Sequence, residues 1–270
     1  MSSQVVFTNK ARCRDCYRCV RVCPVKAIRM QKSQAFVVEE RCIACGTCIR
    51  ECPQGAKSFR QDLEMAELLL KAPGIKVASV APSFVALFPE WQQKRLPSAL
   101  RRLGFDRVEE TAIGAFHVAA ESKKFIESHD RSHICTACPA IVNYVEHYES
   151  EKKDLLVPVV SPMVAHARLI KEKEPQAKVV FFGPCVAKKA EAEWSRNQGI
   201  VDCVLTFTEL SQWLERAGID LARMEESRFD GTPGGDTRLF HLVGGLLRTA
   251  TLSTDPLSEK ILSVSGFEEV

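Results

Sequence analysis

Eight of the twelve cysteines in this chain lie in its first fifth, where the same spacing occurs twice. The run C-x2-C-x2-C-x3-C-P begins at position 13 and begins again at position 42, a period of 29 residues. Thiolates this close together are ligands for soft metal ions and for iron–sulfur clusters. No apolar secretion signal precedes them, which favours metal ligation or redox chemistry over disulfide formation. The eight are Cys13, Cys16, Cys19, Cys23, Cys42, Cys45, Cys48 and Cys52.

This spacing resembles that of the bacterial two-cluster ferredoxins, in which the fourth cysteine of each run binds the other cluster. Three thiolates separated by two residues can wrap a short loop around one cubane corner, and the fourth is already leaving that loop. Paired cysteines also form zinc sites, but two runs of four, each closed by proline, disfavour zinc. The resemblance implies two [4Fe-4S] clusters, one held by Cys13, Cys16, Cys19 and Cys52 and the other by Cys42, Cys45, Cys48 and Cys23.

Basic residues surround the first run, with Asp15 as the one acid among them. They either compensate the negative charge of thiolate-bound clusters or form a docking surface for an acidic electron-transfer partner, and compensation is the simpler explanation. The basic residues are Lys10, Arg12, Arg14, Arg18, Arg21, Lys26 and Arg29.

Longer periodic segments must position whatever chemistry follows the cysteine runs. Residues 61–72 predict a helix that Pro73-Gly74 ends. Beyond it, six β-rich runs alternate with amphipathic stretches, which predicts an α/β domain with parallel sheets flanked by helices. We therefore expect an α+β ferredoxin-like domain at 1–60, a linker helix at 61–73 and this α/β domain at 74–270. The six predicted strands fall within 75–82, 105–113, 133–138, 155–161, 178–184 and 201–207.

Four of these predicted strands end in residues that could do chemistry. In parallel sheets, ligands bind outside the carboxyl ends of the strands. Each segment is weak evidence alone, because proline often begins helices and cysteine is often a small buried hydrophobe. Together they gather thiols and a lysine at one rim. The segments are 81–83 (APS), 135–139 (CTACP), 161–163 (SPM) and 183–189 (GPCVAKK).

The segments T-A-C-P-A, S-P-M and G-P-C-V-A-K-K-A-E resemble the catalytic domain of the [FeFe] hydrogenases, over essentially the whole chain. In that family three motifs hold the H-cluster, a [4Fe-4S] cubane joined to a di-iron centre that carries CO and cyanide. The resemblance implies that Cys138 and Cys185 bind the cubane and that Lys188 contacts a cyanide. It also implies cofactor contacts from Ala81, Pro82, Ser83, Ala137 and Phe240.

Several positions depart from the active members of this family. Those enzymes place a proton-relaying cysteine directly before the first cubane ligand, where this chain has Ala137. Glu121 matches the inner glutamate of the family's proton route, but Lys124 and Val157 replace the outer glutamate and the serine. Losing a general acid–base group typically costs about 10²–10⁴-fold in rate. With Gly183 in place of the usual methionine, the combination is similar to the sensory branch of the family.

The family's third motif, which supplies two further cubane ligands, is expected after residues 261–270, where this sequence stops. The sequence therefore provides two of four expected thiolates, so the chain is a fragment, is completed by a second polypeptide, or no longer binds an H-cluster. Cys203 is expected to be a buried core residue and Cys135 a structural one. The histidines His117, His166 and His241 are interpreted as surface or satisfied core residues.

Two functions remain. The first is an oxidoreductase that passes electrons through two [4Fe-4S] clusters to an H-cluster, for slow H2 oxidation or proton reduction or for H2 sensing, with Lys188 and Glu121 as catalytic residues. The second is a non-catalytic electron-transfer or assembly protein on a vestigial hydrogenase fold. Expected partners are a ferredoxin-like carrier and a signalling module or a chain completing the site. The net charge of +3 and the lack of an 18-residue apolar run predict a cytoplasmic protein without nucleic-acid or membrane binding.

Overall fold

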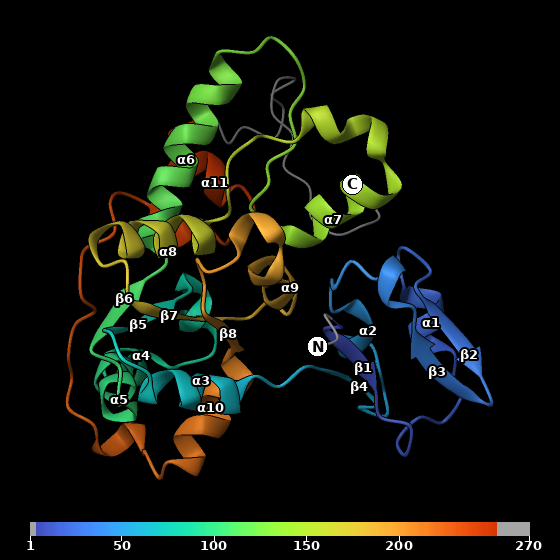
Figure 1. Cartoon of the computed structure of the whole chain (residues 1–270), viewed down its shortest axis with the longest axis horizontal. Coiled ribbons are helices and arrows are strands. Elements are labelled where there is room, and N and C mark those ends of the chain that lie inside the picture. The colour runs from blue at the N-terminus through green and yellow to red at the C-terminus, as the bar shows by residue number, and fades with distance from the viewer. Residues whose placement is uncertain (1–3, 253–270) are drawn as a thin grey trace.

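The computed structural model describes residues 4–252 and has two parts, a small N-terminal region and a larger α/β domain (Figure 1). The N-terminal region lies beside α7 (Pro139–Tyr148) and α9 (Ala187–Glu193) of the larger domain. No helix within residues 4–252 is both long and apolar enough to span a lipid bilayer.

The N-terminal region consists of two small antiparallel sheets and two short helices. Strand β1 (Val6–Thr8) pairs with β4 (Lys57–Phe59), and β2 (Ile28–Gln31) forms a hairpin with β3 (Gln34–Val37). Helices α1 (Arg18–Val22) and α2 (Thr47–Arg50) each bury the third cysteine of a run, and the 3-10 turn η1 (Glu39–Arg41) precedes the second run. Backbone pairing therefore brings both ends of the region together around the cysteines.

A four-stranded parallel sheet forms the centre of the larger domain, in the order β6-β5-β7-β8. Its strands are β5 (Lys76–Val80), β6 (Arg107–Glu110), β7 (Lys178–Gly183) and β8 (Cys203–Thr206). Strands β5, β7 and β8 are buried along nearly their whole length, as expected for a parallel sheet covered on both faces. This confirms the predicted fold class.

Helices cover both faces of the sheet (Figure 1). Helix α8 (Pro162–Lys173) packs against β5 and β7 with α6 (Ala112–Glu127) beside it, whereas α3 (Leu63–Lys71), α5 (Leu96–Leu103) and α10 (Phe207–Arg216) lie on the opposite side. Helix α3 contacts β7 and β8 and buries Leu63 and Ala66 there, so the segment predicted as a linker helix packs on the sheet. The remaining short elements are α4 (Glu90–Gln93), α11 (Gly245–Thr249), η2 (Pro82–Ala86), η3 (Ser150–Leu155), η4 (Ser195–Asn197), η5 (Leu221–Arg223) and η6 (Thr237–Leu239).

Two of the six predicted strands do not form. Residues 133–138 and 155–161 contribute one isolated parallel bridge, between Ile134 and Leu156. Both segments contain or immediately precede a proline, which has no N–H to donate to a sheet. The other four predicted strands are confirmed, as are the helices expected after each of the six runs.

Candidate functional site

The first set of thiols surrounds a small cavity in the N-terminal region. Cys13, Cys16 and Cys19 of the first run line it together with Cys52, the last cysteine of the second run. Cys23, in turn, is close enough to Cys42 and Cys48 to act on their pKa values. The fourth cysteine of each run thus lies with the other run, which is the grouping expected from the two-cluster spacing.

The backbone around the thiols repeats with the same 29-residue period. Asp15 and Ala44 have left-handed φ angles of 54° and 55°, and Tyr17 and Gly46 have φ of 59° and 77°. One further residue with a left-handed φ follows each run, Lys26 after the first and Gly55 after the second. A non-glycine residue in this conformation costs about 1–2 kcal/mol, so other interactions must stabilise these loops in the observed conformation. Repeated strain of this kind is typical of a loop shaped around a bound group.

Backbone N–H groups point at the fourth sulfur of each run. Ala27 N donates to Cys23 Sγ and Ala56 N donates to Cys52 Sγ, both at 3.2 Å. Hydrogen bonds to ligand sulfurs favour the thiolate and are one determinant of the reduction potential of an iron–sulfur cluster. The two cluster sites therefore have the same backbone hydrogen bond to sulfur at equivalent positions of the repeat.

Burial is the largest influence on the pKa values of Cys19, Cys42 and Cys48. It raises the pKa of Cys48 to about 12, and it also raises the pKa values of Cys19 and Cys42. At Cys52 burial acts in the same direction, but N–H groups from the following loop outweigh it and lower the pKa. A thiol such as Cys48 stays protonated in neutral solution and loses its proton on binding a metal. Buried thiols such as Cys19, Cys42 and Cys48, which are costly to ionise alone, fit iron–sulfur ligation.

A second cavity, of about 310 Å³, lies at the point where the strand order reverses. Strand β5 has β6 on one side and β7 on the other, so the chain leaves their carboxyl ends in opposite directions and opens a crevice between them. Eight of the residues predicted to hold or contact the cofactor line this cavity, which we call the switch-point cavity: Ala81, Pro82, Ser83, Ala137, Cys138, Cys185, Lys188 and Phe240.

Lys188 is the charged centre of the switch-point cavity. Its Nζ donates to the backbone oxygen of Ala137 at 3.1 Å and forms an ion pair with Glu191 at 2.7 Å. Burial raises the pKa of Cys185; the cation of Lys188 opposes this rise, and Cys138 adds to it. Cys138 and Lys188 are therefore both close enough to Cys185 to influence its ionisation. Two thiols beside one cation suit the binding of an anionic metal cluster.

The ring of Phe181 lies beside Gly183. A Cβ at this position would lie 2.5 Å from the ring of Phe181, which itself lines the switch-point cavity. The aromatic ring thus fills the space in which a longer side chain at position 183 would lie.

Three positions of the expected proton route do not meet in the switch-point cavity. Glu121 and Lys124 are exposed on α6 and do not line it. Val157 is buried and lines a neighbouring cavity instead. The role of Glu121 in proton transfer therefore stays a prediction. The region of the third motif lies outside the described residues.

The remaining predicted residues are placed as follows. Cys203 is buried in the core, where burial raises its pKa to about 12, as expected. Cys135 does not line the switch-point cavity. His117 and His241 are exposed and His166 is a hydrogen-bonded core residue, all as expected, and His241 also lines the cavity. Adjacency to Phe240 was the available signal for His241.

Thr111 is a lining residue that sequence reasoning missed. It follows β6 directly, so the rule that ligands bind at strand ends would have found it.

The loop of the second cysteine run packs against the switch-point cavity. Cys45 and Cys185 both border one apolar cluster, which includes Val186. Gly46 lies so close that a Cβ there would be 3.3 Å from a methyl group of Val186. The second cluster site and the cavity are therefore separated by little more than one layer of side chains.

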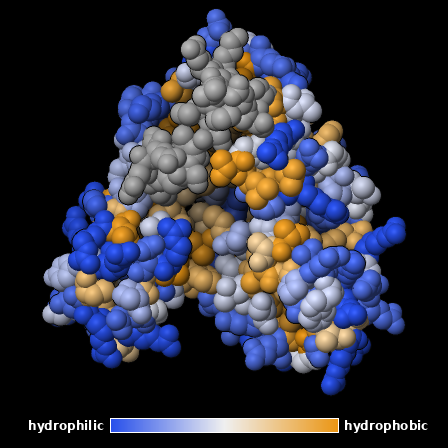
Figure 2. Space-filling view, turned by 180° about the vertical axis from the view of Figure 1, so that it is seen from behind, coloured by the Kyte–Doolittle hydropathy of each residue, from blue (hydrophilic) through white to orange (hydrophobic). Residues whose placement is uncertain are grey.

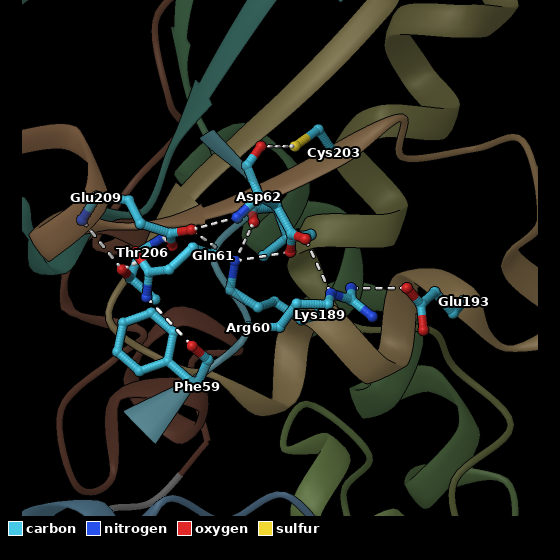
Figure 3. Close-up of polar contacts among 10 residues, drawn as sticks. Phe59, Arg60, Gln61, Asp62, Lys189, Glu193, Cys203, Thr206 and Glu209 are labelled. Carbon is cyan, nitrogen blue, oxygen red and sulfur yellow. Dashed lines mark hydrogen bonds and ion pairs between the residues drawn. The ribbon is translucent and has the colours of Figure 1, made fainter. Parts of the chain in front are cut away.

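A buried ionic network fixes the helix that carries Lys188 (Figure 3). The next residue, Lys189, is fully buried, and its Nζ lies 2.8 Å from Asp62 and 3.0 Å from Glu209. Arg60 bridges Asp62 to Glu193 at the end of α9. These ion pairs join the segment that leads out of the N-terminal region to α9, the helix that carries Lys188. The same contacts therefore hold the two cofactor regions together.

Comparison with known proteins agrees with this geometry. Residues 75–270 match the family described as iron only hydrogenase large subunit, C-terminal domain, and residues 5–53 match the 4Fe-4S dicluster domain. The chain therefore belongs to the iron-only hydrogenase large-subunit family and carries a dicluster domain at its N-terminus.

Particular relatives bring the comparison closer. The NADP-reducing hydrogenase subunit HndD of Solidesulfovibrio fructosivorans is 27% identical over 285 residues, which cover 96% of this chain and 45% of that protein. The cytosolic Fe-S cluster assembly factor NAR1 of Vanderwaltozyma polyspora is 35% identical over 89 residues, covering 32% and 17%. The chain thus spans less than half the length of these relatives.

The fold is also that of solved structures. The structure of HydA(deltaEFG), described as revealing stepwise [FeFe]-hydrogenase H-cluster assembly, aligns with a TM-score of 0.58 at 23% identity, covering 71% of this chain and 56% of that one.

Proposed function

We propose that this chain is an iron–sulfur oxidoreductase that exchanges electrons between an external carrier and an H-cluster in the switch-point cavity, for slow H2 conversion or for H2 sensing. The observation that carries the proposal is the convergence of Cys138, Cys185 and Lys188 in one cavity beside the second cluster site. When bound, the H-cluster supplies the interconversion of H2 with protons and electrons.

The residues of the cavity fit part of that group. Two thiols, Cys138 and Cys185, supply half of the four thiolates that a cubane takes. Lys188, held by Glu191 and by the Ala137 carbonyl, presents a fixed cation to an anionic ligand such as cyanide. The other cubane ligands would come from outside the described residues or from another chain.

The packing of the two cofactor regions supports an order of electron transfer. The second cluster site lies against Val186, next to Cys185, so electrons would enter the cavity from that cluster. The first cluster site, with its basic surroundings, would receive them from a ferredoxin-like carrier. We assign the reaction to the cytoplasm.

Slow turnover or sensing is favoured over fast catalysis by the groups near the cavity. Ala137 has no proton to give, and Glu121 is exposed on α6 away from the lining residues. Cys138, Cys185 and Lys188 match cofactor-binding residues of the family, whereas Ala137, Lys124 and Val157 replace residues of its proton route. A sensor needs the first set and not the second, and it would pass its state to a signalling module.

The test is the iron and acid-labile sulfide content of anaerobically purified protein, co-expressed with the hydrogenase maturases, together with infrared spectra in the CO and cyanide region. More than about eight irons with CO and cyanide bands is the expected result. Cys138→Ala should abolish the bands, whereas Cys203→Ala, at a buried cysteine outside the cavity, should retain them. Bands in neither protein would contradict the proposal.

An electron-transfer or assembly protein without H2 chemistry is the second candidate. It is favoured by the likeness to the assembly factor NAR1 over 89 residues. This candidate expects about eight irons and no CO or cyanide bands in the same measurement.

A further inference from the structure

A buried histidine lies between the sheet and helix α8, close to the switch-point cavity. His166 is 1% exposed, and both of its ring nitrogens have hydrogen-bond partners. Nδ1 lies 2.8 Å from Ser79 Oγ in the middle of β5, and Nε2 lies 2.9 Å from Glu109 Oε2 on β6.

The contacts continue from His166 to the cavity without a break. Ser79 Oγ lies 2.8 Å from Thr111 Oγ1, and Thr111 lines the switch-point cavity. At the other end, the side chain of Glu109 is 14% exposed and lies 3.2 Å from Arg107, which is 30% exposed. Four side chains thus connect the cavity to the protein surface.

Hydrogen-bond chemistry gives this chain one direction. The carboxylate of Glu109 accepts, so His166 Nε2 carries the proton between them and Nδ1 is the acceptor of the ring. Ser79 then donates to Nδ1 and accepts from Thr111. Each hydrogen bond in this series is therefore donated from the residue nearer the cavity to the residue nearer the surface.

We propose that Thr111, Ser79, His166 and Glu109 form a proton relay between the switch-point cavity and solvent. The inference rests on the proposed function, because the cavity exchanges protons only if H2 chemistry takes place there. It supplies a route that does not need a titratable group at position 137.

The transfer is balanced without any electron moving. As Thr111 Oγ1 takes up a proton released by H2 oxidation in the cavity, the Thr111 hydroxyl proton passes to Ser79 Oγ and that of Ser79 to His166 Nδ1. The Nε2 proton then passes to Glu109 Oε2. Four bonds to hydrogen form, four break, and Glu109 releases the proton to water.

The same steps in reverse bring a proton inward. Between transfers the hydroxyls rotate and the imidazole returns to its starting tautomer.

Burial argues for a role beyond packing. Apolar side chains of similar volume could fill the positions of Ser79 and His166 without the cost of desolvating polar groups. Other residues of β5, such as Ala78 and Val80, are indeed apolar and fully buried. The stability of the fold therefore does not require these hydrogen-bonded polar side chains in the core, which favours a functional role for them.

The test uses the full, maturated protein with two substitutions that break the relay at different points. Ser79→Ala removes the link between Thr111 and His166, and Glu109→Gln keeps the hydrogen bond to Nε2 but cannot take up the proton. Ser122→Ala, at a buried serine of α6 outside the relay, is the matched control. H2 evolution should fall about 10²-fold or more in both relay variants and not in the control.

A readout other than activity separates relay from structure. Redox-difference infrared spectra of the wild type should show a carboxylic-acid band that shifts in D2O. The band should be absent from Glu109→Gln and lost from Ser79→Ala, while the CO and cyanide bands are retained. If Ser79→Ala does not fold, Glu109→Gln at the surface end decides.

Unchanged H2 evolution in Glu109→Gln, with intact CO and cyanide bands, would overturn the relay and leave the proposed function standing. A wild-type protein without CO and cyanide bands would overturn both. The two failures are therefore distinguishable in one set of spectra.

Discussion

Lys188 reaches position 137 through the backbone. Its Nζ bonds to the carbonyl oxygen of Ala137 and makes no use of that residue's side chain. The side chain at position 137 can therefore change while the lysine and Cys138 stay in place. Such an arrangement allows the chemistry of the cavity to differ between relatives without disturbing the cofactor-binding residues.

Ala137→Cys should raise H2 evolution in complete, maturated protein, because it places a titratable thiol in the cavity lining. The rate is measured with a chemical reductant, and Ala137→Val serves as the control that adds volume without a dissociable proton. No gain from the cysteine would place the limit at Lys124 and Val157 instead.

The crossed cysteine grouping gives a non-additive prediction about iron content. Cys16→Ser should remove about four irons, and adding Cys52→Ser should remove no more, because both would serve the same cluster. Combining Cys16→Ser with Cys23→Ser should instead remove about eight. Iron and sulfide analysis checks this, and equal losses in the two double variants would refute the crossed assignment.

At the scale of elements, the buried ionic network around Lys189 holds α9, the helix that carries Lys188 into the switch-point cavity. Lys189 sits between two carboxylates and also donates to the backbone of β8, so one side chain joins α9, α10 and the segment before α3. Glu209 also completes a capping box with Thr206 at the start of α10. Removing the lysine would leave buried carboxylates without their counter-charge.

Lys189→Met should lower the free energy of unfolding by about 3–5 kcal/mol, the usual effect of breaking a buried ion pair. Denaturant unfolding followed by circular dichroism measures it. Lys94→Met, at an exposed lysine paired with Glu90 on α4, should leave the transition nearly unchanged. Similar shifts in both variants would mean that the network contributes little.

Much of the site could be predicted because strand ends carry their own signals. The segments after β5 and β7 showed their prolines, thiol and lysine in the sequence, and the structure brings them together. Thr111 was missed because a single threonine after a strand has no distinctive spacing. The relay could not be predicted at all, since Ser79 and His166 are 87 residues apart and meet only when α8 packs on β5.

The strand errors have a similar cause. Residues 133–138 and 155–161 have the apolar composition of strands, but their position beyond the sheet leaves them one bridge between Ile134 and Leu156. Composition reports burial, whereas pairing depends on which neighbours the fold provides.

At the scale of the whole molecule, the charge of the N-terminal region is concentrated on its surface. All seven basic residues around the first cysteine run are exposed, and Arg18 is paired with Glu51. Figure 2 shows hydrophilic residues over much of the outer surface of this region, on the left of the view. Such a surface suits association with an acidic carrier, at rates that fall with ionic strength.

Charge reversal tests this surface. Arg12→Glu with Arg14→Glu should slow reduction by an acidic ferredoxin at low salt and weaken its salt dependence, as stopped-flow absorbance would show. Lys71→Glu with Lys173→Glu makes the same change in net charge on exposed helix positions of the α/β domain. Equal slowing in both double variants would mean that net charge, not the surface around the first cluster, sets the rate.

The two cofactor sites differ in how much chain they need. The cysteines of the dicluster region lie within residues 13–52, whereas the lining of the switch-point cavity extends from residue 81 to residue 241. During synthesis the first site is complete long before the second exists, and contacts close in sequence form early. We expect pulse-labelled iron to enter the dicluster region first. Biogenesis would then be ordered by the chain itself: the two [4Fe-4S] clusters can be loaded on a protein whose switch-point cavity has not yet formed.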